Sequence, residues 1–145
     1  MQIDKETEFF LKNRVKKKAK LHHLLEPNEL RQDRLRQLKE DNLTSPQILS
    51  VKNIKVKSEC NQGINLRFYF PKNFKKNKKN SIIIFFHGGG FVMGNLDTHD
   101  FTCRSICIES KMIVLAVDYS LSPEYKFPYA LNEAKYVLKL SLIHI

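Results

Sequence analysis

A histidine followed by three glycines is the first feature of the sequence that could do chemistry: His87-Gly88-Gly89-Gly90-Phe91. It comes directly after the apolar run 82–86, which is typical of a buried strand. Glycines allow the backbone to turn sharply and to bring its N–H groups close to a ligand, because no Cβ intervenes. Converging N–H groups are what the oxyanion of an acyl-transfer reaction requires. A structural glycine turn and a phosphate-binding loop are the alternatives, although the chain has no G-x-G-x-x-G or G-K-[ST] motif.

The elements around this run predict an α/β arrangement. A second continuous apolar run, residues 113–117, follows a helical stretch predicted from about residue 98 to residue 110. A strand, a helix and a strand in this order form a βαβ unit, so the two runs are predicted to be adjacent parallel strands. Ligands bind at the carboxyl ends of such strands, where the glycines lie. Another helix is predicted over residues 129–140.

The N-terminal part has a different pattern. The first 43 residues are predicted to form two helices with little apolar surface, the second with Pro27 in its first turn. Alternating residues in 54–56 and 64–70, on either side of the turn signal Asn61-Gln62-Gly63, predict an antiparallel hairpin with one solvent-facing side. We therefore divide the chain into a helical flap, residues 1–45, and a core segment, residues 46–145.

Composition excludes several classes of protein. With 145 residues, 42% hydrophobic and 28% charged, the chain has the balance of a globular domain and not of a disordered, collagen-like or disulfide-rich protein. No apolar run approaches the length of a membrane span and the N-terminus has no secretory signal, so no stable membrane insertion is expected. Three cysteines, an odd number, indicate reduced thiols in a cytoplasmic protein.

The net charge of +10 comes from two runs, residues 12–20 and 72–79, which contain six and five cations and no acid. Nucleic-acid-binding proteins concentrate basic residues in this way. However, the first run contains no aromatic residue and the second contains only Phe74, so neither has an alternation of basic and aromatic residues suited to base stacking. Lysine also outnumbers arginine, whereas specific readout favours arginine. Solvated faces without a nucleic-acid partner are therefore the favoured interpretation, and a basic nucleic-acid-associated protein is the less favoured alternative.

One helix carries residues at a spacing that could bind a metal ion. His99, Cys103 and Cys107 are four residues apart and share one helical face. A structural zinc site requires four ligands, and no fourth ligand has a matching spacing. Because free cysteine is commonly a small buried hydrophobe, we predict no metal site here. Asp97 or Thr98 is predicted as the N-cap of this helix.

Several blocks of the sequence occur in a fixed order: 87–94 (HGGGFVMG), 97–100 (DTHD), 103–104 (CR), 117–124 (VDYSLSPE) and 127–130 (FPYA). They resemble the hormone-sensitive-lipase-like branch of the α/β-hydrolases, a family of carboxylesterases and lipases. The fourth and fifth blocks are similar to D-Y-R-L-A-P-E and F-P-A-A of that family. Ser120 and Ser122 stand where the family usually has arginine and alanine, and Glu133 lies near the place of an aspartate. The resemblance covers residues 82–140.

The resemblance implies an α/β-hydrolase fold, a mostly parallel sheet with flanking helices and a helical N-terminal flap. It assigns the N–H groups of Gly89 and Gly90 to an oxyanion hole, with Gly88 as the turn-forming residue and His87 orienting the loop. It implies a small-molecule ester substrate and a serine acyl-enzyme mechanism without cofactor or metal. No particular oligomeric state is predicted.

Two carboxylates could be mistaken for an acid–base pair. Asp118 and Glu124 lie six residues apart across a proline-containing loop. The resemblance gives them a structural role in fixing the loop after the strand. His144, near the end of the chain, is not assigned as a catalytic base.

No G-x-S-x-G motif occurs in the chain, although the family mechanism requires a serine on such a turn, followed by an acid and a histidine. The family carries these residues after the F-P-A-A block. We therefore expect the core segment to be truncated before the nucleophile and the 145 residues alone to be inactive. A truncated, non-catalytic hydrolase-like binding protein is the main alternative.

Overall fold

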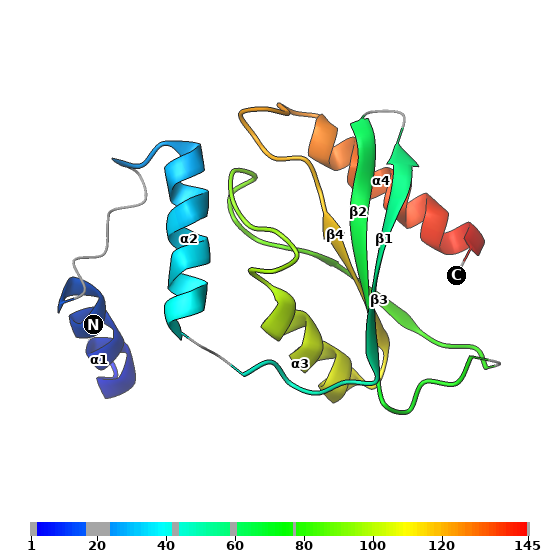
Figure 1. Cartoon of the computed structure of the whole chain (residues 1–145), viewed down its shortest axis with the longest axis horizontal. Coiled ribbons are helices and arrows are strands. Elements are labelled where there is room, and N and C mark those ends of the chain that lie inside the picture. The colour runs from blue at the N-terminus through cyan, green and yellow to red at the C-terminus, as the bar shows by residue number, and fades with distance from the viewer. Residues whose placement is uncertain (1–2, 17–23, 42–43, 59–60, 77, 145) are drawn as a thin grey trace.

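The computed structural model describes residues 3–16, 24–41, 44–58, 61–76 and 78–144. Within these residues the chain forms four helices and four strands (Figure 1). In chain order they are α1 (Lys5–Lys16), α2 (Pro27–Asp41), β1 (Ser50–Ser58), β2 (Asn61–Phe70), β3 (Ile82–Phe86), α3 (Asp100–Ser110), β4 (Ile113–Asp118) and α4 (Tyr129–His144). Pro27 is the first residue of α2, as predicted.

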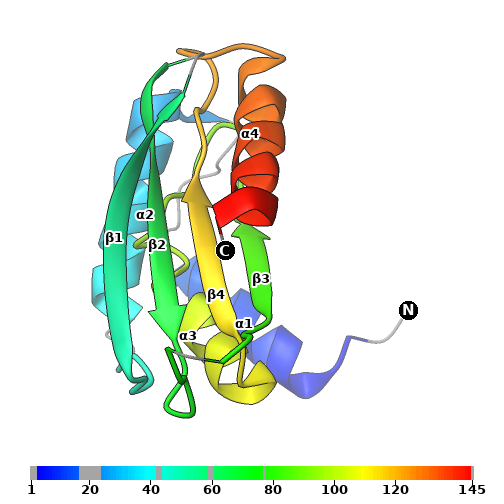
Figure 2. The same cartoon turned by 90° about the vertical axis from the view of Figure 1, so that its right-hand side faces the viewer.

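The four strands form one sheet in the order β1-β2-β4-β3 (Figure 2). β3 and β4 are adjacent and parallel, with Ile82 opposite Ile113 and Phe86 opposite Val117, and α3 connects them. The βαβ unit predicted from the two apolar runs is therefore confirmed. β1 and β2 form the predicted antiparallel hairpin, and β2 also pairs antiparallel with β4.

β4 is the central strand of the core because it is covered on both faces. Val114 and Ala116 pack with Cys103 and Cys107 of α3. The alternate residues of β4 pack on the opposite face in a cluster that includes Val137 of α4. Figures 1 and 2 show α3 and α4 on opposite sides of the sheet. A strand buried on both faces reads as a continuous apolar run, which is why the sequence identifies it.

β3 is the exception to this burial. Its first four residues are half-buried and Phe86 is exposed, because β3 is an edge strand of the described sheet. The prediction that residues 82–86 are buried on both faces is therefore wrong for the described chain. A continuous apolar run indicates that a strand can be buried, but its neighbours decide whether it is.

The hairpin differs from its prediction in two respects. The turn signal was placed at Asn61-Gln62-Gly63, but these residues already belong to β2, and the residues between Ser58 and Asn61 lie outside the described part. Gly63 instead belongs to a bulge, with φ of +118°, and a Cβ there would come within 2.9 Å of the Val56 carbonyl oxygen. The predicted solvent-facing side is also wrong at Tyr69, which is fully buried beneath α3.

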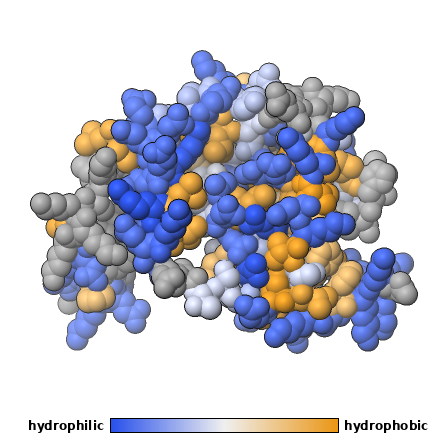
Figure 3. All heavy atoms as spheres, in the orientation of Figure 1, coloured by the Kyte–Doolittle hydropathy of each residue, from blue (hydrophilic) through white to orange (hydrophobic). Residues whose placement is uncertain are grey.

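The two N-terminal helices lie to one side of the sheet, α2 nearer to it than α1 (Figure 1). α1 exposes Phe9 and Val15, whereas α2 contacts the core through Arg31. The face seen in Figure 3 is mostly hydrophilic, with its hydrophobic groups in separate patches. None of the helices in the described residues is long and apolar enough to cross a membrane. The division into a flap and a core segment stays a prediction.

Candidate functional site

The glycine loop, residues 87–94, begins where β3 ends. Gly89 and Gly90 have φ of +138° and +60°, and Phe91 follows with φ of 61°. A Cβ on Gly89 would collide with the carbonyl oxygen of Met93, so this position requires glycine. Gly88 has no positive φ and open space around it, so the turn lies one residue later than predicted. The loop closes on itself because the N–H groups of Val92 and Met93 both donate to the Gly89 carbonyl, at 3.1 and 3.0 Å.

The N–H groups of the three glycines in this loop are available to a ligand. Among the hydrogen bonds of the described residues, none is donated by the N–H of Gly88, Gly89 or Gly90. The three glycines line a cavity of about 520 Å³ together with mainly apolar side chains from the segment after β4 and from α4: Phe127, Pro128, Ala130, Leu131 and Ala134. Backbone donors at the edge of an apolar cavity can bind an oxyanion whose remaining substituents are apolar.

His87 is buried behind the loop, with 5% of its surface exposed. Its ring stacks on Tyr119 at 4.3 Å between centroids and on His99 at 5.4 Å. The Tyr119 hydroxyl donates to the His87 carbonyl at 2.6 Å, so the loop is tied to the end of β4. Nδ1 of His87 lies 3.1 Å from the Gly88 carbonyl, and a Cβ on Gly94 would collide with the same ring. His87 therefore packs against both ends of the loop and against Tyr119, as expected of a residue that supports the loop.

His99 is the N-cap of α3, where the sequence predicted Asp97 or Thr98. The Thr98 hydroxyl accepts the Asn95 N–H at 2.9 Å instead and lies 3.0 Å from Nδ1 of His99. Burial and the neighbouring His87 lower the pKa of His99. The predicted cap is wrong because the Thr98 hydroxyl is engaged within its own turn.

Asp118 and Glu124 have separate partners. Asp118 accepts a hydrogen bond from the Asn65 amide at 3.3 Å, and burial raises the pKa of its carboxyl group. Glu124 is held by Arg31, which lowers the pKa of this carboxyl group to about 2. Each carboxylate thus has a polar partner of its own, in line with the structural role that the resemblance implies.

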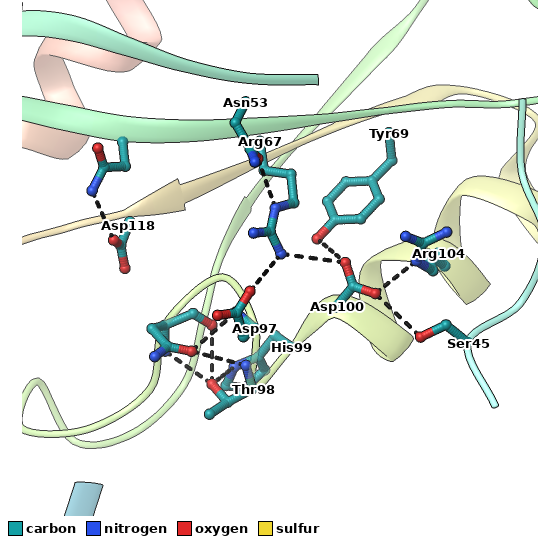
Figure 4. A network of polar contacts seen from close by, with 12 residues as sticks. Ser45, Asn53, Arg67, Tyr69, Asp97, Thr98, His99, Asp100, Arg104 and Asp118 are labelled. Atoms are coloured by element: carbon teal, nitrogen blue, oxygen red, sulfur yellow. Dashed lines mark hydrogen bonds and ion pairs between the residues drawn. The ribbon is translucent and has the colours of Figure 1, made fainter. Parts of the chain in front are cut away.

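A cluster of charged side chains under α3 was not anticipated from the sequence. Asp100 accepts hydrogen bonds from the Tyr69 hydroxyl at 3.0 Å and from Arg104 at 2.6 Å, and Arg67 lies 3.4 Å away (Figure 4). The members of this Asp100 network are Ser45, Arg67, Tyr69, Asp97, Asp100 and Arg104. Burial raises the pKa of the Tyr69 hydroxyl. The network connects the hairpin, α3 and the segment before β1.

Glu133 of α4 is the most deeply buried carboxylate described, with 1% of its surface exposed. It accepts the Ser120 N–H at 2.6 Å and the Ser120 hydroxyl at 2.8 Å. Ser120 and Glu133 are two of the positions at which the sequence departs from the family pattern. A serine and a glutamate fix the segment after β4 here.

Cys103 and Cys107 are free thiols packed in the core. Burial raises the pKa of Cys103 to about 11, which keeps the thiol protonated. Within the described residues, no group of three histidine, cysteine or acidic side chains is placed to bind a metal ion. Cys60 lies outside the described residues, as does the side chain of His144.

The two basic runs differ in how far they are described. In residues 72–79 every lysine is exposed, as expected for a solvated face. Of residues 12–20, the structure describes the backbone only as far as residue 16.

Comparison with known proteins identifies the fold around this loop. Residues 83–143 match the family described as "alpha/beta hydrolase fold". Esterase LipI of Mycobacterium tuberculosis is 45% identical over 71 residues, which are 49% of this chain and 22% of that protein. Carboxylesterase NlhH of the same species is 33% identical over 109 residues, 73% of this chain and 32% of that protein.

A solved structure agrees over nearly the whole chain. The hyperthermophilic esterase from the archaeon Pyrobaculum calidifontis superposes with a TM-score of 0.84 at 26% identity, over 99% of this chain and 45% of that one. The chain belongs to the α/β-hydrolase family. Its relatives place it in the hormone-sensitive-lipase-like branch of esterases and lipases, as the sequence resemblance predicted. It spans less than half the length of each of these relatives.

Proposed function

We propose that this chain takes part in the hydrolysis of a small-molecule carboxylic ester and supplies the oxyanion hole of that reaction. The observation that supports this most directly is that the N–H groups of Gly89 and Gly90 donate no hydrogen bond within the described residues. These groups follow the carboxyl end of β3 and lie beside a mainly apolar cavity. The esterase relatives support the same reaction class.

In the proposed reaction a serine Oγ attacks the ester carbonyl carbon, and its proton passes to a general base. The carbonyl oxygen becomes an oxyanion, which the N–H groups of Gly89 and Gly90 stabilise. Collapse of the tetrahedral intermediate breaks the bond to the alcohol, which leaves with a proton from the base. Water then hydrolyses the acyl-enzyme by the same two steps.

The attacking serine is not assigned to any residue of this chain. None of its serines lies in a G-x-S-x-G motif, and glycine N–H groups stabilise charge but provide no nucleophile. We therefore propose that the 145 residues supply the oxyanion loop, His87 as its support and a flap over the site, without the catalytic triad. No cofactor is required by this chemistry.

The proposal is tested with a fusion that joins residues 1–145 to the part of carboxylesterase NlhH that follows its matched region. The fusion should release nitrophenol from short-chain nitrophenyl esters. Gly89→Ala should lower kcat by about a hundredfold, the usual loss when an oxyanion donor is displaced. Lys76→Ala, an exposed residue of the lysine-rich loop, is the control and should leave kcat unchanged.

A folded fusion that does not turn over any ester would contradict the proposed reaction. It would favour the second candidate, a hydrolase-like protein that binds a ligand without catalysis, which the absence of a nucleophile motif in these residues also supports. Unchanged kcat in Gly89→Ala would remove Gly89 from the mechanism.

A further inference from the structure

We propose that Arg31 of α2 is a positioning residue that fixes the glycine loop, so that docking of the flap and the geometry of the oxyanion hole are coupled. This inference rests on the proposed function. Arg31 lies on a helix that the sequence predicts only as a covering element, and no motif includes it.

Arg31 joins α2 to two loops of the core through backbone oxygens. Its Nε donates to the Val92 carbonyl at 2.7 Å, two residues after Gly90. One terminal nitrogen donates to the Ser122 carbonyl, also at 2.7 Å, in the loop after β4. Both bonds are short and connect residues more than 60 positions apart in the sequence. The helix is thus attached to the same two loops that line the cavity.

Glu124 orients the guanidinium group for these contacts. Its two carboxylate oxygens each accept a hydrogen bond of 2.8 Å from a different terminal nitrogen of Arg31. A bidentate pair fixes the plane of the guanidinium group, which a lysine ammonium cannot reproduce. The pair therefore aims Nε at Val92.

The glycine loop depends on such contacts because its own backbone is unfavourable. Phe91 has φ of 61°, a conformation that residues with a Cβ seldom adopt without support from surrounding structure. The Ser122 N–H donates to the Phe91 carbonyl at 2.8 Å, and Arg31 holds the next carbonyl, Val92. The Val92 N–H in turn donates to the Gly89 carbonyl at 3.1 Å. A shift of Val92 is therefore transmitted to Gly89.

Arg36 provides a matched control on the same helix. It is 63% exposed and pairs with Asp33 and Glu40, both of α2 itself. Arg36→Gln removes the same charge as Arg31→Gln, and among the described residues Arg36 has no hydrogen bond to the glycine loop or to the loop after β4. Arg31→Lys keeps the charge and removes the bidentate geometry.

The first experiment records amide spectra of uniformly ¹⁵N-labelled residues 1–145. Arg31→Gln should shift the Gly89 and Gly90 resonances. It should also speed hydrogen exchange at least fivefold at the Val92 and Met93 amides, which donate to the Gly89 carbonyl. Arg31→Lys should reverse these changes only in part, and Arg36→Gln should leave the loop unchanged. Glu124→Gln, which retains both backbone contacts of Arg31, should produce a smaller shift in the same direction. Unchanged glycine resonances in Arg31→Gln, or in Glu124→Gln if the first variant does not fold, would overturn the proposal.

The second experiment measures kcat per active site titrated with a fluorophosphonate, in the NlhH fusion. Arg31→Gln should lower this value at least tenfold with KM changed less than twofold, whereas loss of folded protein alone would reduce the number of titrated sites and not the rate per site. An unchanged rate per site would overturn the coupling. A fusion with Arg31 intact and no esterase activity would refute the proposed function alone, because the amide spectra test the Arg31 contacts without catalysis.

Discussion

The glycine loop and the Asp100 network are both rich in polar groups, but they use them in opposite ways. In the network, Asp100 accepts from Tyr69, Arg67 and Arg104, so each charged group faces another group of the chain. In the loop, the N–H groups of Gly88 to Gly90 donate to nothing among the described residues. Gly88 and Gly90 are exposed and Gly89 is half-buried, so a ligand in the adjoining cavity can reach these donors.

We therefore expect the network to contribute to folding and the loop to ligand binding. Substitutions in the first region should reduce stability, whereas those in the second should chiefly alter the loop and what it binds. The predictions below test this separation.

The largest effect is expected from Asp100→Ala. Asp100 is 20% exposed, and its removal leaves the guanidinium groups of Arg67 and Arg104 without their shared carboxylate. We expect a loss of about 3 kcal/mol in the free energy of unfolding, measured by urea denaturation, since breaking a partly buried ion pair leaves uncompensated charge. Asp97→Ala is the control: Asp97 is 67% exposed and should cost less than about 1 kcal/mol. If both variants lose the same small amount of unfolding free energy, the network does not stabilise the fold.

A smaller effect should separate two neighbouring positions of the loop. Gly89→Ala places a Cβ against the Met93 carbonyl at a positive φ and should cost about 2 kcal/mol of unfolding free energy. Gly88→Ala has open space and ordinary φ, so its cost should stay within about 0.5 kcal/mol. Urea denaturation of both variants checks this, and a native fold should persist in each. Equal costs at the two positions would contradict the observed turn.

The contact between Tyr119 and the loop should contribute less to the free energy of unfolding than glycine at position 89 does. Tyr119→Phe removes the donor to the His87 carbonyl and should cost about 1 kcal/mol, the usual net value of such a hydrogen bond. Tyr136 of α4 packs against the hydrophobic cluster that contains Tyr119, and its hydroxyl makes no hydrogen bond within the described residues, so Tyr136→Phe is the matched control. Thermal unfolding of the two variants distinguishes them. A Tyr119→Phe variant as stable as the control would show that the loop is held without this bond.

The smallest effect is the pH dependence of the Arg31–Glu124 pair. The pKa of Glu124 is lowered from about 4.5 to about 2, so the folded state binds fewer protons than the unfolded state between these values. The stability from this pair is therefore fully present above about pH 4.5 and is lost as the pH falls toward 2. The difference in stability between the native protein and Glu124→Gln, measured by urea denaturation from pH 2 to pH 6, should shrink over that interval. A difference that stays constant down to pH 2 would show that the pair is not ionised as the structure has it.

Local sequence patterns predicted the elements but not what covers them. The parallel pair of β3 and β4 follows from two apolar runs and one helix, and the glycine loop lies where it was expected. The burial of Tyr69 was missed because an alternating pattern assigns it to a wet face, whereas α3 packs on that face. The edge position of β3 was not predicted because its continuous apolar run is typical of a strand covered on both faces, whereas in the described sheet only β4 pairs with it.

The contacts that shape the site depend on residues far apart in the sequence. Arg31 and Glu124 are separated by 93 positions, and no local pattern relates them. The resemblance assigned the turn to Gly88, whereas the positive φ angles lie at Gly89 and Gly90. The cytoplasmic location and the lack of a nucleic-acid partner stay predictions, the latter testable by salt-dependent retention on a DNA or RNA column.

The central claim is that this chain supplies donors for an oxyanion and no nucleophile. The most direct measurement treats purified residues 1–145 with a fluorophosphonate probe and quantifies covalent labelling by intact-mass spectrometry, with nitrophenol release from short-chain esters recorded in parallel. We predict no labelled serine and no turnover above the buffer rate, because none of the serines lies on a nucleophile turn with an activating base. Stoichiometric labelling of one serine, with turnover that follows the purified chain, would contradict the account.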